Sequence, residues 1–85
     1  MSYNYQEQRA NLFTDEGQQL FIRIRDQTKS LLAQAGAARM DKMMAGCEGD
    51  SWDMLACADR MVELGEIKEI SPATSPGQYR VFIAS

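Results

Sequence analysis

Residues 50–70, DSWDMLACADRMVELGEIKEI, decide the fold, because they read as a capped helix, a glycine stop and a short strand. Asp50 is a typical N-cap residue, and Asp53 follows three positions later, in the style of a capping box. Gly65 is a typical helix stop, and the isoleucines in residues 66–71 indicate a strand. The apolar residues between cap and stop repeat with helical spacing. They are Met54, Leu55, Ala58, Met61 and Val62.

The chain after residue 70 predicts a second strand and therefore a β-hairpin. Residues 71–77, SPATSPG, hold two prolines, two serines and a glycine, which is typical of a loop. Residues 78–84 then alternate between two faces. One face holds Tyr79, Val81 and Ile83, and the other holds Gln78, Arg80 and Phe82. Because an isolated hairpin is only marginally stable, we expect it to pack on the helices.

The chain before residue 50 predicts two further helices. Thr14 is a typical N-cap and Gly36 a typical stop, so we expect a long helix between them. Residues 37–45 indicate a short second helix, and we interpret its methionines as core rather than as an adaptable binding surface. The apolar stripe of the long helix is Leu20, Phe21, Ile24, Leu31, Leu32 and Ala35, with Thr28 in the gap. The methionines are Met40, Met43 and Met44.

Residues 1–13 are mostly polar and predict a loose N-terminal arm. Tyr3 and Tyr5 are separated by one residue, so an edge strand is the alternative for this segment. Residues 14–85 are then expected to form one domain, as the length of 85 residues also indicates.

Three helices followed by a hairpin resemble the winged helix-turn-helix family. The segment AARMDKMMAG, residues 37–46, looks like the second helix and turn of that family. Residues 50–70 look like its third helix, glycine and first wing strand, and residues 71–83, SPATSPGQYRVFI, look like its wing loop and return strand. The resemblance is one of architecture and patterning over residues 14–83. It implies an α+β fold, a small winged helix of three helices followed by a C-terminal β-hairpin wing.

The family is best known for DNA reading, in which the third helix enters the major groove and the wing touches the backbone. Carried over to this chain, the resemblance implies nucleic-acid contacts at Ser51 and Arg60 on the third helix and at Gln78 and Arg80 in the wing. Arg39 and Lys42 on the second helix are three positions apart, and their positive charge adds two further candidate contacts.

The charge of the predicted third helix opposes this role. Residues 50–66 hold one basic and five acidic residues, so their formal charge is 1 minus 5, or −4. The whole chain carries a formal net charge of −3. Because lysine and arginine contacts to phosphates supply most of the affinity for DNA, this balance disfavours nucleic acid as a partner.

We therefore predict a regulatory module that acts mainly through protein–protein contacts, as an adaptor or by self-association, with a protein partner or a second copy bound. The DNA-binding regulator is the alternative. The candidate protein-interaction face on the third helix is Asp53, Cys57, Asp59, Arg60 and Glu63.

Several classes of chemistry find no support in the residues. Histidine is absent, which excludes serine–histidine catalysis and histidine-dependent zinc sites. The sequence shows no nucleophile–base pair, phosphate-binding glycine loop or metal-ligand spacing, so we predict no enzyme, catalytic residue, cofactor, metal or small-molecule site. Cys47 and Cys57 are interpreted as reduced thiols in or near the core.

The same residues lack the patterns of membrane proteins and secreted proteins. No apolar run approaches the roughly 20 residues of a membrane span. The polar start MSYNYQEQRANLF lacks the apolar core of a signal peptide. We therefore expect a cytoplasmic location and no membrane partner.

Overall fold

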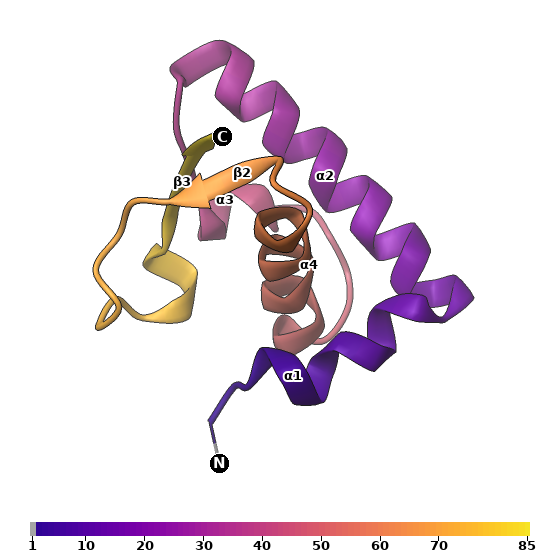
Figure 1. Cartoon of the computed structure of the whole chain (residues 1–85). Helices are drawn as coiled ribbons and strands as arrows, with labels where there is room; N and C mark the ends of the chain where they lie inside the picture. Colours follow the sequence, from indigo (N-terminus) through magenta and orange to yellow (C-terminus); the bar gives the residue numbers. More distant parts are fainter. Residues whose placement is uncertain (1) are drawn as a thin grey trace.

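The structure is a computed structural model that describes residues 2–85. It has an α+β fold in which helices pack beside a small antiparallel sheet (Figure 1), so the predicted α+β class is confirmed. The elements in chain order are α1 (Tyr5–Gln8), η1 (Arg9–Phe13), α2 (Asp15–Ala35), β1 (Ala38–Arg39), α3 (Met40–Met43), α4 (Ser51–Glu63), β2 (Ile67–Glu69), η2 (Gly77–Tyr79) and β3 (Val81–Ala84). Among residues 2–85, no helix combines the length and apolar character needed to cross a membrane.

The ends predicted for the two long helices are confirmed. The Thr14 hydroxyl accepts a hydrogen bond from the Gly17 amide at 3.0 Å and so caps α2. Gly36 ends α2 with a φ of 77°, a left-handed conformation that glycine adopts without steric cost. The Asp50 carboxylate accepts from the Trp52 amide at 2.7 Å and caps α4.

The two predicted C-terminal strands pair in antiparallel orientation, with Ile67 opposite Ala84 and Glu69 opposite Phe82. A third strand, β1, pairs with the other edge of β3 and places Ala38 opposite Phe82, so the strand order is β1-β3-β2. We did not expect β1 from the sequence, because two residues are too few to show an alternating pattern.

Two predicted elements are shorter than expected. The second helix, expected over residues 37–45, is reduced to Met40–Met43 because the two preceding residues join the sheet. The last strand, expected over residues 78–84, begins only at Val81, because the chain before it forms the short 3-10 helix η2.

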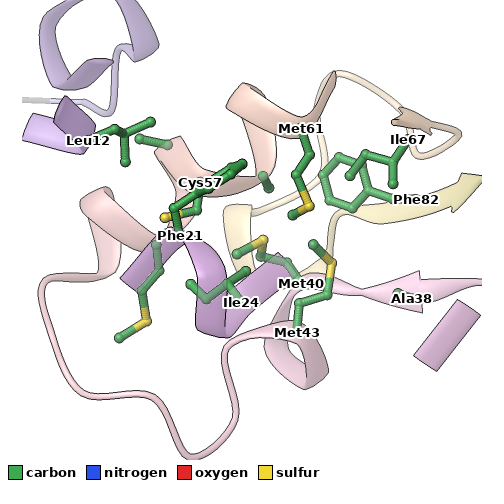
Figure 2. Packing of buried hydrophobic residues seen from close by; sticks show 13 residues of the cluster. Leu12, Phe21, Ile24, Ala38, Met40, Met43, Cys57, Met61, Ile67 and Phe82 are labelled. Atoms are coloured by element: carbon green, nitrogen blue, oxygen red, sulfur yellow. The ribbon is translucent and has the colours of Figure 1, made fainter. Parts of the chain in front are cut away.

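The core lies where α2, α3 and α4 meet the sheet, and Figure 2 shows its side chains. Met40 and Met43 are fully buried, which confirms their interpretation as core residues, whereas Met44 is only partly buried. Thr28 is also fully buried, and its hydroxyl donates to the Ile24 carbonyl at 2.7 Å. The polar residue in the apolar stripe therefore has a hydrogen-bond partner inside the core.

Residues 2–13, called the strap below, differ from the expected loose arm of residues 1–13, of which Met1 lies outside the described residues. Both α1 and η1 pack against α4, and η1 also packs against α2. Leu12 is buried and joins the core cluster. A Cβ atom on Gly17 would lie 2.1 Å from the Asn11 carbonyl oxygen, so this glycine allows η1 to fold back onto the start of α2.

Candidate interaction face on helix α4

Helix α4 turns one side toward the core and the opposite side toward the strap. The core side is Met54, Cys57, Ala58 and Met61. The outward face of α4 is defined by Asp53, Ala56, Asp59, Arg60 and Glu63, which are three or four positions apart and so share one side of the helix. Ala56 is fully buried although it lies on this face. Since α1 and η1 both pack on α4, we infer that the strap covers it.

Glu63 joins the strap to the end of α4. Arg9 donates to both carboxylate oxygens at 3.1 Å, and the Tyr5 hydroxyl donates to one of them at 3.0 Å. Arg60, one turn earlier on α4, donates to the same carboxylate. These donors, Arg60 foremost, hold the pKa of Glu63 below its usual range. The guanidinium carbons of Arg9 and Arg60 also lie 5.0 and 5.3 Å from the ring centroid of Phe13, so two cations contact this exposed ring.

Asp59 and Arg80 form a second polar centre, where α4, the sheet and the strap meet. Arg80 Nη2 lies 2.7 Å from Asp59 and 2.9 Å from Glu69, and the Tyr3 hydroxyl donates to Asp59 at 2.6 Å. Burial opposes the charge of Arg80, but its hydrogen bonds with Glu69 and Asp59 outweigh this effect and raise the pKa of the guanidinium. Burial and the acceptor Asp59 also raise the pKa of Tyr3, so the phenol keeps its proton and remains a donor.

Cys57 was predicted on the interaction face, and the structure corrects this. The side chain is fully buried and belongs to the core cluster in Figure 2. Cys57 lies three positions after Met54 and four before Met61, so it shares the core side of α4 with these two buried residues. Burial, followed by the charge of Asp53, raises the pKa of the thiol to about 12. Both cysteines are free thiols, and Cys47 is partly buried.

The three arginines among the predicted nucleic-acid contacts are bound to carboxylates. Arg39 lies 2.7 Å from Asp41, and Arg60 and Arg80 are bound to the acids of the outward face and of β2 described above. The hydrogen bond from Arg39 lowers the pKa of Asp41. A phosphate group would have to compete with these carboxylates for each guanidinium.

The other three predicted contacts are exposed. Within residues 2–85, Lys42 makes no ion pair. Ser51 and Gln78 line one hollow of about 270 Å³ together with Trp52 and Leu55, so the structure brings the start of α4 and η2 together. Neither Ser51 nor Gln78 carries the positive charge that phosphate binding needs.

A second hollow, of about 410 Å³, lies between the starts of α2 and α4. Its lining includes Glu16, Glu48, Asp50 and Asp53, and no lysine or arginine is among the residues that line it. If α4 read DNA as the resemblance implies, its first turn would meet base edges, and this turn borders four carboxylates that repel phosphate. In the part of the chain that the structure describes, no cluster of histidine, cysteine, aspartate or glutamate is arranged to hold a metal ion.

Four strap residues that contact the outward face were missed in the sequence. They are Tyr3, Tyr5, Arg9 and Asn11, whose amide donates to Asp53 at 3.2 Å. One feature of the sequence indicates these contacts: a segment rich in hydrogen-bond donors precedes a predicted helix rich in carboxylate acceptors.

Comparison of the chain with protein-family models, with curated proteins and with solved structures finds no match.

Proposed function

We propose that this chain is a small, non-enzymatic winged-helix regulatory module that acts through protein–protein contacts made by the outward face of α4. The observation that carries the proposal is that this face already binds a polypeptide segment. Asp53, Asp59 and Glu63 each accept a hydrogen bond from a side chain of the strap. A face of carboxylate acceptors around a small apolar residue fits a donor-rich segment of protein better than it fits a polyanion.

The order of elements supports the winged-helix part of the proposal. Helices α2, α3 and α4 precede the antiparallel strands β2 and β3, in the sequence of three helices and a wing that the resemblance implies. The segment between β2 and β3 contains the loop and η2, and it contributes Gly77 and Gln78 to the hollow beside α4. The wing and the third helix therefore border one surface.

The pairing of charges supports protein contacts over DNA contacts. Of the six arginines in the chain, five are ion-paired: Arg9, Arg25, Arg39, Arg60 and Arg80. Each pair would have to break, at least in part, before its arginine neutralised a phosphate. With the formal charge of −4 over residues 50–66, few cations remain to supply the affinity of DNA binding.

The reactive groups of the described residues support a non-enzymatic role. The Cys57 thiol has a pKa of about 12 and stays protonated at neutral pH, so it is a poor nucleophile. The Thr14 hydroxyl donates to the Asn11 carbonyl, and the Thr28 hydroxyl donates to the Ile24 carbonyl. These hydroxyl groups serve the backbone of the helices.

A DNA-binding regulator is the second candidate function. It is favoured by Lys42, Ser51 and Gln78, which are exposed and lie on α3, α4 and η2. This mode would leave the outward face of α4 under the strap and would use only the edge of the helix.

Titration of a fluorescent random duplex, followed by anisotropy at about 50 mM salt, tests the choice between these functions. We expect no binding by the wild-type chain and a gain of salt-sensitive binding by the variant Glu48→Lys/Asp53→Lys, whose start of α4 is basic. Salt-sensitive binding of the wild type that Lys42→Gln weakens would instead establish the DNA-binding regulator.

Light scattering over a range of chain concentrations supplies the second arm of the test. A chain that binds no duplex but associates with itself or with an isolated protein partner fits the proposal. A chain that stays monomeric and binds neither would contradict it.

A further inference from the structure

We propose that the outward face of α4 is a docking surface for the strap of a second copy of this chain, so that two chains exchange residues 2–13 and form a symmetric dimer. The inference rests on the proposed function, because it names the partner of the same protein-binding face. The structure shows one segment seated on this face, and a second copy supplies the identical segment.

Most hydrogen bonds between the strap and α4 are open to water. Arg9 and Glu63 keep side-chain exposures of 37% and 36%, and the hydrogen bonds from Tyr5 to Glu63 and from Asn11 to Asp53 are also exposed. Exposed ion pairs of this kind contribute little to stability. The apolar anchor within the two strap helices is Leu12, since α1 contains no buried residue and η1 contains this one. Release of the strap therefore breaks exposed polar contacts and withdraws Leu12 from the core, and both are restored when the strap docks on a second copy.

The connection between strap and domain is short and extended. Thr14 alone separates η1 from α2, and its φ of −87° and ψ of 163° place it in the extended region between two helical segments. Its hydroxyl caps α2 through the Gly17 amide, a bond that stays within α2 when the strap swings away. A short hinge between two rigid segments favours domain swapping, in which two chains exchange an identical segment and so form a dimer.

The strap and α4 carry opposite charges where they meet, so substitutions can reverse the sign of the charge on either side. The strap offers the guanidinium of Arg9, and α4 offers the carboxylate of Glu63, to which Arg9 donates twice. The strap in its own chain competes at an effective concentration in the millimolar range. We therefore expect the wild type to exchange straps only near that concentration, and to exchange at lower concentration once the closed form is weakened.

Mixing of charge-reversed chains tests the exchange. In the Arg9→Glu variant, the new carboxylate of the strap repels Glu63 of the same chain. In the Glu63→Lys variant, Arg9 of the strap repels the new lysine on α4 of the same chain. In a mixture, the strap of each variant is attracted to α4 of the other. We expect the mixture to double its mass in sedimentation equilibrium at a chain concentration at least about tenfold below that needed by either variant alone or by the wild type. The double variant Arg9→Glu/Glu63→Lys is the matched control, because it restores attraction within one chain and should behave as the wild type does.

A mixture that keeps the single-chain mass under these conditions would overturn the exchange. If a variant loses its circular dichroism signal, a labelled peptide of residues 2–13, SYNYQEQRANLF, added to the wild-type chain decides instead. Displacement of the strap, seen as faster hydrogen exchange of its amides at millimolar peptide, supports the exchange, and unchanged amides overturn it. The duplex titration tests the proposed function separately from the exchange. A mixture that stays monomeric and binds no duplex rules out the exchange of straps but does not rule out an adaptor that binds a different protein.

Discussion

Arg80 donates to Asp59 at 2.7 Å, and this contact ties the residue just before β3 to the middle of α4. The same guanidinium reaches Glu69 on β2 at 2.9 Å and lies 5.1 Å from the ring centroid of Phe82. Its side chain is 14% exposed, so the cation is largely removed from water between two carboxylates. The position of the β2–β3 hairpin relative to α4 therefore depends on Arg80, a residue that the sequence suggested as a phosphate contact.

Arg80→Gln should lower the free energy of unfolding by about 2–3 kcal/mol, because it leaves Asp59 and Glu69 close together without their shared cation. Arg39→Gln is the matched control, since the pair of Arg39 and Asp41 is exposed and should contribute far less to stability. Urea denaturation measures the loss in both variants. Equal losses would show that Arg80 does not hold the β2–β3 hairpin to α4.

The Glu69 carboxylate should make stability fall in acid. Its hydrogen bond from Arg80 depresses the pKa below the ordinary value of 4.5, so the folded state binds the proton less readily than the unfolded state. The stabilisation is therefore complete above pH 4.5 and is lost as the pH falls through the lower pKa of the folded chain. Urea midpoints measured from neutral pH to about pH 3 should fall less steeply in Glu69→Gln than in the wild type. An identical slope in the two chains would contradict the pairing.

Met61→Ala should lower the free energy of unfolding by about 2–4 kcal/mol, because Met61 is 1% exposed and its removal leaves a cavity beside Ile67 and Phe82. The adjacent control is Val62→Ala, whose residue is 37% exposed and should cost less than about 1 kcal/mol. Urea denaturation measures the free energy of unfolding of both variants. A larger loss in Val62→Ala than in Met61→Ala would contradict the assignment of Met61 to the core side of α4.

The ends of the long helices were predictable because their signals are local. Thr14, Gly36 and Asp50 act on backbone groups within four positions along the chain, so their chemistry is visible in any short window. The two C-terminal strands were also predictable, since loop residues separate two apolar runs. The register of the sheet was not, because Ala38 pairs with Phe82 from the opposite half of the chain.

The candidate site was less predictable than the fold. The strap packs through the buried Leu12 and through Tyr3 and Arg9, whose carboxylate partners lie more than 50 positions later, so no single short window of the sequence contains both sides of these contacts. Cys57 was assigned to the wrong side of α4 from its place in the third helix of the resemblance, although the adjacent residues, Ala56 and Ala58, are uncharged and Cys57 itself is buried. The acidic character of the outward face, in contrast, followed directly from composition, since it depends on residue types alone.

Gly17→Ala should loosen the strap without changing any residue of α4, because the new methyl group would lie 2.1 Å from the Asn11 carbonyl oxygen. We expect amides of residues 5–13 to exchange hydrogen at least about tenfold faster, while core amides of α4 keep their protection. Gln19→Ala is the control on the same helix, since Gln19 is exposed. Equal protection of the strap in both variants would show that η1 does not depend on this close approach.

Whether the outward face of α4 binds protein and not DNA is decided by one nuclear magnetic resonance experiment. The ¹⁵N-labelled wild-type chain is titrated in parallel with the peptide of residues 2–13 at millimolar concentration and with a random duplex at low salt. Because the peptide reproduces the contacts of the strap that it displaces, we predict that it shifts the amide signals of the released residues 5–13. The duplex should shift neither these signals nor those of Asp53, Ala56, Asp59 and Glu63. Shifts of these four signals caused by the duplex, with strap signals that the peptide leaves unmoved, would contradict protein binding at this face.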